Sequence, residues 1–296
     1  MTTLQRYGLL LGLLLLVACG APAPLPTPTA NPTTAAMIPV LAASELVVGS
    51  NRLPLGIIRG GVPINDPNLT LQLRFFYLGG TDKTTVRGET AAIYRGQRLP
   101  IGLYVAHATF DVAGAWSIEV TIPRANSAPQ VSRIRIEVLA TSVIPSVGEK
   151  AIPSHNLTIR EVPDLKQLTS DPEPDPALYQ LTIADAIAAK KPFVVIMATP
   201  GYCQTAVCAP NMLVVKELKT KYGQRANFIH VEVYPYPFNE SFQKMLRVPT
   251  LEEWHLQTEP WLFLVDANGI IQSRYEGGIT LQELEPDMEQ LTGGAG

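Results

Sequence analysis

The stretch that decides the fold of the second half of the chain is FVVIMA, residues 193–198. An uninterrupted apolar run of this length, followed by the turn-forming residues Thr199-Pro200-Gly201, predicts a strand. Two cysteines, Cys203 and Cys208, come shortly after this turn. The predicted strand therefore leads straight into a pair of thiols.

Outward from this strand, the hydrophobic pattern alternates between helix and strand. A short helix is expected at 183–189, and a longer one at about 210–222, where Met212, Val215 and Leu218 recur at helical spacing. Further elements are expected along the rest of the chain: strands at 228–233, 261–265 and 270–275, a polar helical stretch at 239–246, and a final helix that begins with a capping box of Thr280 and Glu283.

This order of elements resembles the thioredoxin-like fold, and two motifs resemble that family at its key positions. FVVIMAT, residues 193–199, is similar to the strand and loop that lead to the thioredoxin active site. PWLFLVDANGII, residues 260–271, is similar to the strand of membrane-tethered thioredoxins that begins at the cis-proline of the family. The resemblance implies an α/β thioredoxin-like domain at 181–293, with a cis peptide bond between Glu259 and Pro260 opposite the thiols.

The spacing of the cysteines departs from the Cys-x-x-Cys motif of the family, because four residues separate Cys203 from Cys208. On one unbroken helix, the Cα atoms of such a pair would lie roughly 8 to 9 Å apart, which is too far for a disulfide. Pro210, however, is tolerated in a helix only near its first turn. We therefore expect the helix to begin near Cys208 and to leave Cys203 in the preceding loop, where a disulfide becomes possible.

The roles of the two thiols stay open at this point. A thiolate at a helix N-terminus is stabilised by unpaired backbone N–H groups, so an alignment of residues 208–211 with the family motif makes Cys208 the more acidic thiol. A second alignment makes Cys203 the attacking thiol and Tyr202 the counterpart of the usual tryptophan. In either case, the resemblance implies catalytic roles for both cysteines and contact with an extended substrate by four residues: Tyr202, Pro210, Glu259 and Pro260.

The resemblance implies a thiol–disulfide oxidoreductase that acts on protein disulfides and needs no cofactor. Three alternatives stay open. Thr199-Pro200-Gly201 before Cys203 resembles, one position out of register, a branch of the peroxiredoxins, which reduce peroxides. Cys203, Cys208 and His255 would suit Cu(I), as in the thioredoxin-fold copper chaperones. The third alternative is a surface binding protein in which the two cysteines form a structural disulfide.

The first half of the chain predicts strands almost throughout, with apolar and polar residues alternating between short turns. Such alternation is typical of strands with one buried and one solvated face. About seven short strands over 45–162 match the number in an immunoglobulin-like sandwich. An acidic, proline-rich hinge at 163–180 follows. The fold class expected for the whole chain is therefore multidomain, with an all-β immunoglobulin-like sandwich followed by an α/β thioredoxin-like domain.

The N-terminus predicts export and a lipid anchor. An apolar run at 8–17 is too short to span a bilayer, and the Leu16-Val17-Ala18-Cys19 that ends it resembles the lipobox of bacterial lipoprotein signal peptides. The resemblance implies a signal peptide at 1–19, lipidation of Cys19 and an extracytoplasmic position on the cell membrane. Residues 20–44, rich in Pro, Thr and Ala, are expected to form a tether without a core. An ordinary secretory signal and an uncleaved anchor are the alternatives.

The charge balance and the number of cysteines indicate which binding partners to expect. The chain has 23 Lys and Arg against 26 Asp and Glu, a net charge of -3, and no dense basic run, so nucleic acid is not an expected partner. Of its 3 cysteines, lipidation would use Cys19 and leave Cys203 and Cys208 as a pair in an oxidising compartment. A disulfide that closes so small a loop stabilises little. The expected partners are therefore the membrane, through the lipid, and extracytoplasmic protein thiols or disulfides.

Overall fold

The computed structural model describes residues 35–125 and 127–293. Residues from Ala35 onward belong to one compact unit. The predicted signal peptide at 1–19, with Cys19, and the tether up to residue 34 lie outside the described residues. The last part of the segment predicted as tether forms strand β1 (Met37–Leu41), which pairs with the next strand along the chain.

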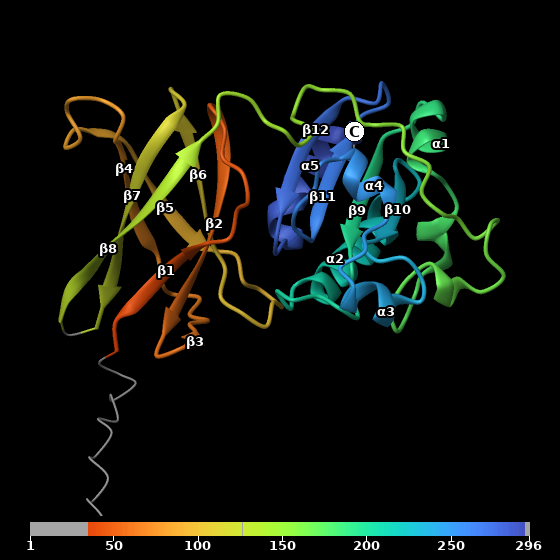
Figure 1. Ribbon diagram of the computed structural model, residues 1–296, viewed down its shortest axis with the longest axis horizontal. Helices are drawn as coiled ribbons and strands as arrows, with labels where there is room; N and C mark the ends of the chain where they lie inside the picture. The colour runs from red at the N-terminus through yellow and green to blue at the C-terminus, as the bar shows by residue number, and fades with distance from the viewer. Residues whose placement is uncertain (1–34, 126, 294–296) are drawn as a thin grey trace, which may run out of the picture. The chain divides into compact units, whose positions relative to one another are not determined.

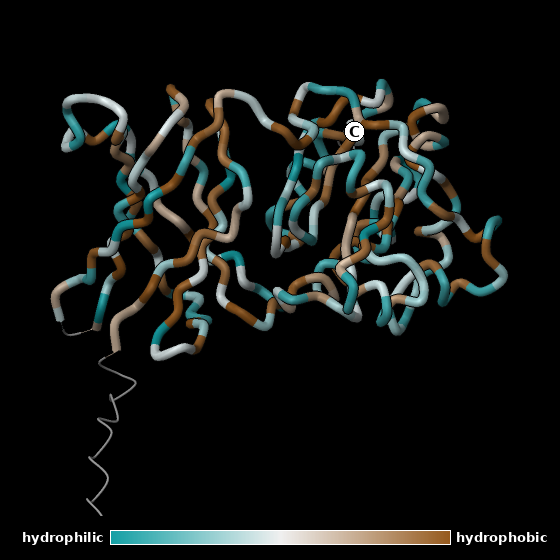
Figure 2. Tube along the Cα trace, viewed as in Figure 1, coloured by the Kyte–Doolittle hydropathy of each residue, from teal (hydrophilic) through white to brown (hydrophobic). Residues whose placement is uncertain are grey.

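The first sheet contains eight strands and is antiparallel throughout. After β1, its strands are β2 (Gly49–Arg59), β3 (Val62–Pro63), β4 (Leu71–Tyr77), β5 (Val86–Tyr94), β6 (Tyr104–Phe110), β7 (Gly114–Arg124) and β8 (Ser127–Val138). The strand order is β1-β2-β6-β5-β4-β7-β8, and β3 pairs with β2. Figure 2 shows hydrophilic and hydrophobic residues alternating along several of these strands.

This sheet curls into a nearly closed barrel (Figure 1). Its two ends meet where the Gln130 side chain of β8 bonds both backbone groups of Met37 in β1: Met37 N–H donates to Oε1 at 2.9 Å, and Nε2 donates to the Met37 carbonyl. Inward-facing residues such as Leu55, Trp116 and Ile118 are buried in the interior. One curled sheet therefore encloses one core.

The prediction of an immunoglobulin-like sandwich over 45–162 is wrong. A sandwich needs two sheets packed face to face, whereas these strands follow one continuous path of pairing. The physical reason is that an alternating pattern marks one buried face on each strand in a sandwich and in a barrel alike. The pattern does not determine which strands pair.

The second sheet has four strands in the order β10-β9-β11-β12. They are β9 (Phe193–Ala198), β10 (Asn227–Glu232), β11 (Trp261–Val265) and β12 (Ile271–Glu276). β9 and β10 are parallel, and the other pairs are antiparallel. The α-helices among the described residues are α1 (Ile183–Ala188), α2 (Cys208–Tyr222), α3 (Phe238–Gln243), α4 (Pro249–Glu253) and α5 (Leu281–Leu291), and two short 3₁₀ helices lie at Leu165–Gln167 and Pro176–Tyr179.

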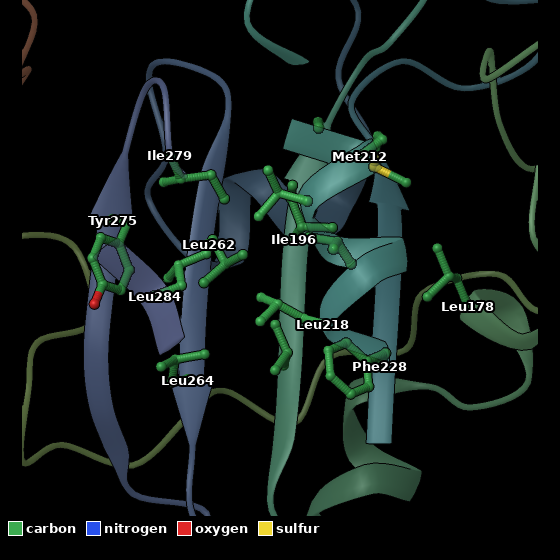
Figure 3. Close-up of a cluster of buried hydrophobic side chains, with 14 of the residues drawn as sticks. Leu178, Ile196, Met212, Leu218, Phe228, Leu262, Leu264, Tyr275, Ile279 and Leu284 are labelled. Atoms are coloured by element: carbon green, nitrogen blue, oxygen red, sulfur yellow. The ribbon is translucent and has the colours of Figure 1, made fainter. Parts of the chain in front are cut away.

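Strand β9 is buried on both faces. Val194, Ile196 and Ala198 join the cluster that includes residues of α2 and α5, part of which Figure 3 shows. The alternate residues Phe193 and Val195, together with Met197, join a second cluster that includes residues of α1 and α4. An uninterrupted apolar run is what such a two-sided position requires, and the strand occupies the range expected from the sequence.

The predicted class of the second half, an α/β thioredoxin-like domain at 181–293, is also wrong. The described residues are mostly β: a nearly closed antiparallel barrel and a second sheet, with five α-helices of which α1, α3 and α4 span only five or six residues. No α/β thioredoxin-like domain is evident among them. The two motifs that carried the resemblance specify local strands and a loop, and these form, but such short stretches do not determine the class of the whole fold.

Buried charges join the two sheets within the compact unit. Arg52 of β2 forms an ion pair with Glu283 of α5, with Nε and Oε1 2.6 Å apart and both side chains less than a tenth exposed. Arg52 also donates to the carbonyls of Glu276 and Gly278 at 2.7 Å. A buried ion pair of this kind needs such additional hydrogen bonds to offset the loss of water. None of the helices in the described part of the chain is both long and apolar enough to cross a membrane.

Candidate thiol site

Strand β9 and helix α2 bring the two cysteines together. Helix α2 begins at Cys208, with Cys203 in the preceding loop, so the predicted start of this helix is confirmed. Val207 at the N-cap makes no side-chain capping bond. The first N–H of any helix lacks a partner within the helix, and here this Cys208 N–H donates to the sulfur of Cys203 at 3.3 Å. Both cysteines are free thiols.

Cys203 is the partly exposed member of the pair, and its surroundings favour the thiolate. The pKa of Cys203 falls to about 5, because the Cys208 thiol donates to its sulfur, the Thr205 hydroxyl bonds to it and the Cys208 backbone N–H points at it. Burial acts in the opposite direction. The Thr205 Oγ1 lies 3.3 Å from the Cys203 sulfur. Hydrogen bonds to a charged form lower the pKa of an acid.

Cys208 is fully buried and keeps its proton. Its hydrogen bond to the Cys203 sulfur raises the pKa of Cys208, and burial raises that pKa further. The alignment that made Cys208 the more acidic thiol is therefore wrong about acidity. The reason is that the N–H at the start of α2 points at the sulfur of Cys203, whereas a thiol gains acidity only from donors that reach its own sulfur.

Glu259 and Pro260 lie beside the thiols. The antiparallel register pairs Trp261, the first residue of β11, with Met197 near the end of β9, and this brings the residues before Trp261 to the loop that carries the cysteines. The predicted cis peptide bond between Glu259 and Pro260 is confirmed. A carboxylate oxygen of Glu259 and the two sulfurs all lie within 4.8 Å of one another. Burial and the negative charge of Cys203 raise the pKa of Glu259.

The other predicted site residues are placed differently. Tyr202 is half-buried, with its ring centroid 5.4 Å from that of Phe242. Pro210 is a half-buried residue in the first turn of α2. His255 is exposed and does not belong to the group of metal-binding side chains that contains the cysteines. The Cu(I) ligand set proposed with His255 is therefore not assembled in the described part of the structure.

Two polar residues of the site, Thr205 and Tyr234, were not predicted from the sequence. Thr205 gave no signal, since a hydroxyl between two cysteines is unremarkable until the loop is folded. Tyr234 follows β10 and is almost completely buried, and its hydroxyl has no hydrogen-bond partner among the described residues. Burial and the negative charge of Glu259 raise the pKa of Tyr234. This phenol therefore responds to the carboxylate that lies beside the thiols.

Glu232, a third residue that the sequence analysis did not identify, holds the loop after β9 through Ser170. It is buried at the end of β10, and its Oε2 accepts hydrogen bonds from the backbone N–H and the hydroxyl of Ser170 at 2.7 and 2.8 Å. The Ser170 hydroxyl oxygen in turn accepts from the N–H of Gly201 at 2.9 Å. Burial raises the pKa of Glu232 to about 7. The signal for it was a carboxylate within a strand that is otherwise mostly apolar.

None of the known family models matches this chain. No curated protein matches it either. Its function is therefore argued from the geometry and charge of the thiol site.

The buried carboxylate gives the stability of the protein a specific dependence on pH. A carboxyl group with a folded-state pKa of about 7, against about 4.3 in the unfolded chain, stabilises the fold below the unfolded value and loses this effect as pH rises through the folded value. In Glu232→Gln the group cannot ionise. We expect the unfolding free energy of this variant, relative to that of the wild type, to rise by about 3 kcal/mol between pH 4 and pH 8.

Urea unfolding of both proteins across this pH range measures the difference. Glu240→Gln is the matched control, because Glu240 is exposed and should show almost no such change. A difference between wild type and Glu232→Gln that does not vary with pH would show that burial leaves the pKa of Glu232 at its unfolded value.

Proposed function

We propose that this protein is a thiol–disulfide oxidoreductase that acts on protein disulfides through Cys203 and Cys208. The observation that carries the proposal is the geometry of the pair: a partly exposed sulfur, Cys203, receives the first N–H of α2 at 3.3 Å while a second, buried thiol lies beside it. The exposed sulfur can thus attack a substrate disulfide, and the buried thiol can resolve the mixed disulfide that forms.

In the first step, the Cys203 thiolate attacks one sulfur of the substrate disulfide. A bond forms between Cys203 and that sulfur, the substrate S–S bond breaks, and the other substrate sulfur leaves as a thiolate that takes up a proton. Only Cys203 has the exposure for this attack, since Cys208 is fully buried.

In the second step, Cys208 loses its proton and its sulfur attacks that of Cys203. The Cys203–Cys208 disulfide forms, and the substrate leaves as a second thiol, so that two electrons have passed from the protein to the substrate. Glu259 is the carboxylate in place to accept the proton of Cys208. A dithiol protein would restore the reduced pair, and the same steps in reverse would oxidise a substrate.

Substrate contact is proposed for the residues around the sulfurs. The cis-proline segment at Glu259 and Pro260 lies next to the thiols and directly precedes β11, so a substrate bound at Cys203 would contact it. Tyr202, beside Cys203, and Pro210, in the first turn of α2, flank the pair along the chain.

No specific observation favours the peroxidase alternative. In the described part of the chain, no arginine donates a hydrogen bond to either sulfur, as activation of a peroxide would require. The guanidinium of Arg247, whose charge partly offsets the rise in the pKa of Glu259, donates to the carbonyls of Leu256 and Gln257.

The proposal includes a place of action. The lipobox resemblance at Cys19 supports a lipid anchor on the cell membrane and an extracytoplasmic position, where protein thiols and disulfides are the partners and nucleic acid is not. This part rests on the sequence alone, because residues 1–34 lie outside the described residues.

The central experiment traps the mixed disulfide. The parent for this experiment is the full chain with Cys19→Ser, in which only two cysteines remain. When Cys208→Ser is added, the protein should accumulate a mixed disulfide between Cys203 and insulin, whose disulfides serve as the substrate. Cys203→Ser should form almost none, because its remaining thiol is buried and protonated. Mass spectrometry of acid-quenched mixtures counts the complexes.

Insulin reduction by the chain with both cysteines intact should be at least about 100-fold faster than by either variant, since the pair acts as a unit. Trapping by Cys203→Ser instead of Cys208→Ser would reverse the roles. Trapping by neither variant would contradict the proposal.

A second experiment tests the anchor. In a bacterial host that processes lipoproteins, we expect the native chain to incorporate labelled fatty acid and to sediment with membranes, and Cys19→Ser to do neither, because the thioether bond to the lipid needs that sulfur. Native chain that stays unlabelled would contradict the lipid anchor. Labelled Cys19→Ser would place the lipid elsewhere.

A further inference from the structure

We propose that the reduced protein binds one thiophilic divalent cation of the Zn²⁺ class through Cys203, Cys208 and Glu259. The two sulfurs and one carboxylate oxygen are the only such group of three or more His, Cys, Asp and Glu ligand atoms that comes together in the described residues. This inference goes beyond the proposed redox function and does not depend on it, because cation binding involves no transfer of electrons.

The distances are close to those that a metal site needs. All three donor atoms lie within 4.8 Å of one another. Around a tetrahedral Zn²⁺ with Zn–S bonds of about 2.3 Å, two sulfurs stand about 3.8 Å apart. The donors therefore need to approach by at most roughly 1 Å. Cys203 lies in a partly exposed loop and can make this movement. Cys208 is fixed as the first residue of α2, and Glu259 is fixed by its position two residues before β11.

The chemistry of the donors selects the class of cation. Hard ions such as Mg²⁺ and Ca²⁺ prefer oxygen ligands throughout, whereas thiolates favour softer metals. A single carboxylate beside two thiolates suits the borderline Zn²⁺, which accepts Cys and Glu together. Three protein ligands with one position left for water or another ligand are typical of open zinc sites. The partial exposure of Cys203 provides the path to that fourth position.

A further observation, beside the geometry of the donors, concerns the buried phenol of Tyr234. Its hydroxyl is buried without a hydrogen-bond partner among the described residues. Buried polar groups almost always have partners, so this one calls for an explanation. Burial and the negative charge of Glu259, one of the three donors, raise the pKa of this phenol. Outer-shell polar groups of this kind commonly accompany metal ligands.

The consequence is competition between two states of one pair of sulfurs. Cys203 and Cys208 cannot form a disulfide while both coordinate a cation, and their disulfide has no thiolate to offer a metal. Bound cation would therefore protect the thiols from oxidation, and oxidation would release the cation.

The test is a metal titration of the reduced chain that carries Cys19→Ser. The protein is stripped with a chelator and transferred to oxygen-free buffer, and Zn²⁺ is then added in competition with a chromophoric chelator. We expect one Zn²⁺ per chain and, with Co²⁺ in its place, a thiolate-to-cobalt charge-transfer band. Cys203→Ser and Cys208→Ser should lose the site.

Glu259→Gln should weaken binding at least about tenfold, the lower end of the cost of losing even an outer-shell partner. Glu240→Gln, an exposed carboxylate elsewhere, is the matched control and should bind as the parent chain does. Circular dichroism establishes that each variant is folded. Absence of the charge-transfer band, or binding that a folded Glu259→Gln leaves unchanged, would overturn the proposal. Neither readout uses disulfide turnover, so failure here is distinct from failure of the redox function.

Discussion

The hydrogen bonds that converge on the Cys203 sulfur, from the Cys208 thiol, the Thr205 hydroxyl and the Cys208 backbone N–H, are the interaction on which the site depends. The backbone bond exists because α2 begins at Cys208, whose N–H has no acceptor within the helix. A helix directs its unpaired N–H groups away from its first turn. Here one of them reaches the sulfur of the preceding loop. These donors together favour charge on Cys203, while Cys208, which supplies two of them, stays protonated and buried.

Strand β9 supplies the constraint beneath that bond. Because both faces of β9 are buried, its register with β10 and β11 leaves little freedom at its carboxyl end. The parallel partner β10 ends at Glu232, which holds the loop through Ser170, and the antiparallel partner β11 starts just after Pro260. Loop, carboxylate and cis-proline therefore meet at one edge of the sheet because three strands are aligned.

The parts of this arrangement that depend on residues close together in the sequence were predictable. The strand at 193–198 and the start of α2 near Cys208 follow from local patterns, the cis bond before Pro260 was implied by the resemblance of residues 260–271, and the structure has all three. The class of the fold was not predictable. A sandwich was predicted where the structure has a barrel, because an alternating pattern does not determine which strands pair. The α/β class was predicted from two short motifs, which do not specify a whole domain.

The electrostatics of the site were beyond the sequence for a related reason. Which thiol is more acidic depends on which sulfur the N–H of α2 faces, and that direction is set only when the loop folds. Thr205 bonds to the Cys203 sulfur from a position that carries no spacing signal. Glu232 is the exception, since a carboxylate in the buried strand NFIHVE was visible as an anomaly.

The most direct test of the central claim is the order in which the two thiols ionise. With ¹³C label on both Cβ atoms, nuclear magnetic resonance follows each cysteine separately in reduced, metal-free protein as pH changes. The account predicts that Cys203 ionises near pH 5, far below the ordinary thiol value of about 8.5, and that Cys208 stays protonated above that ordinary value. Ionisation of Cys208 first, or of both thiols near the ordinary value, would contradict it.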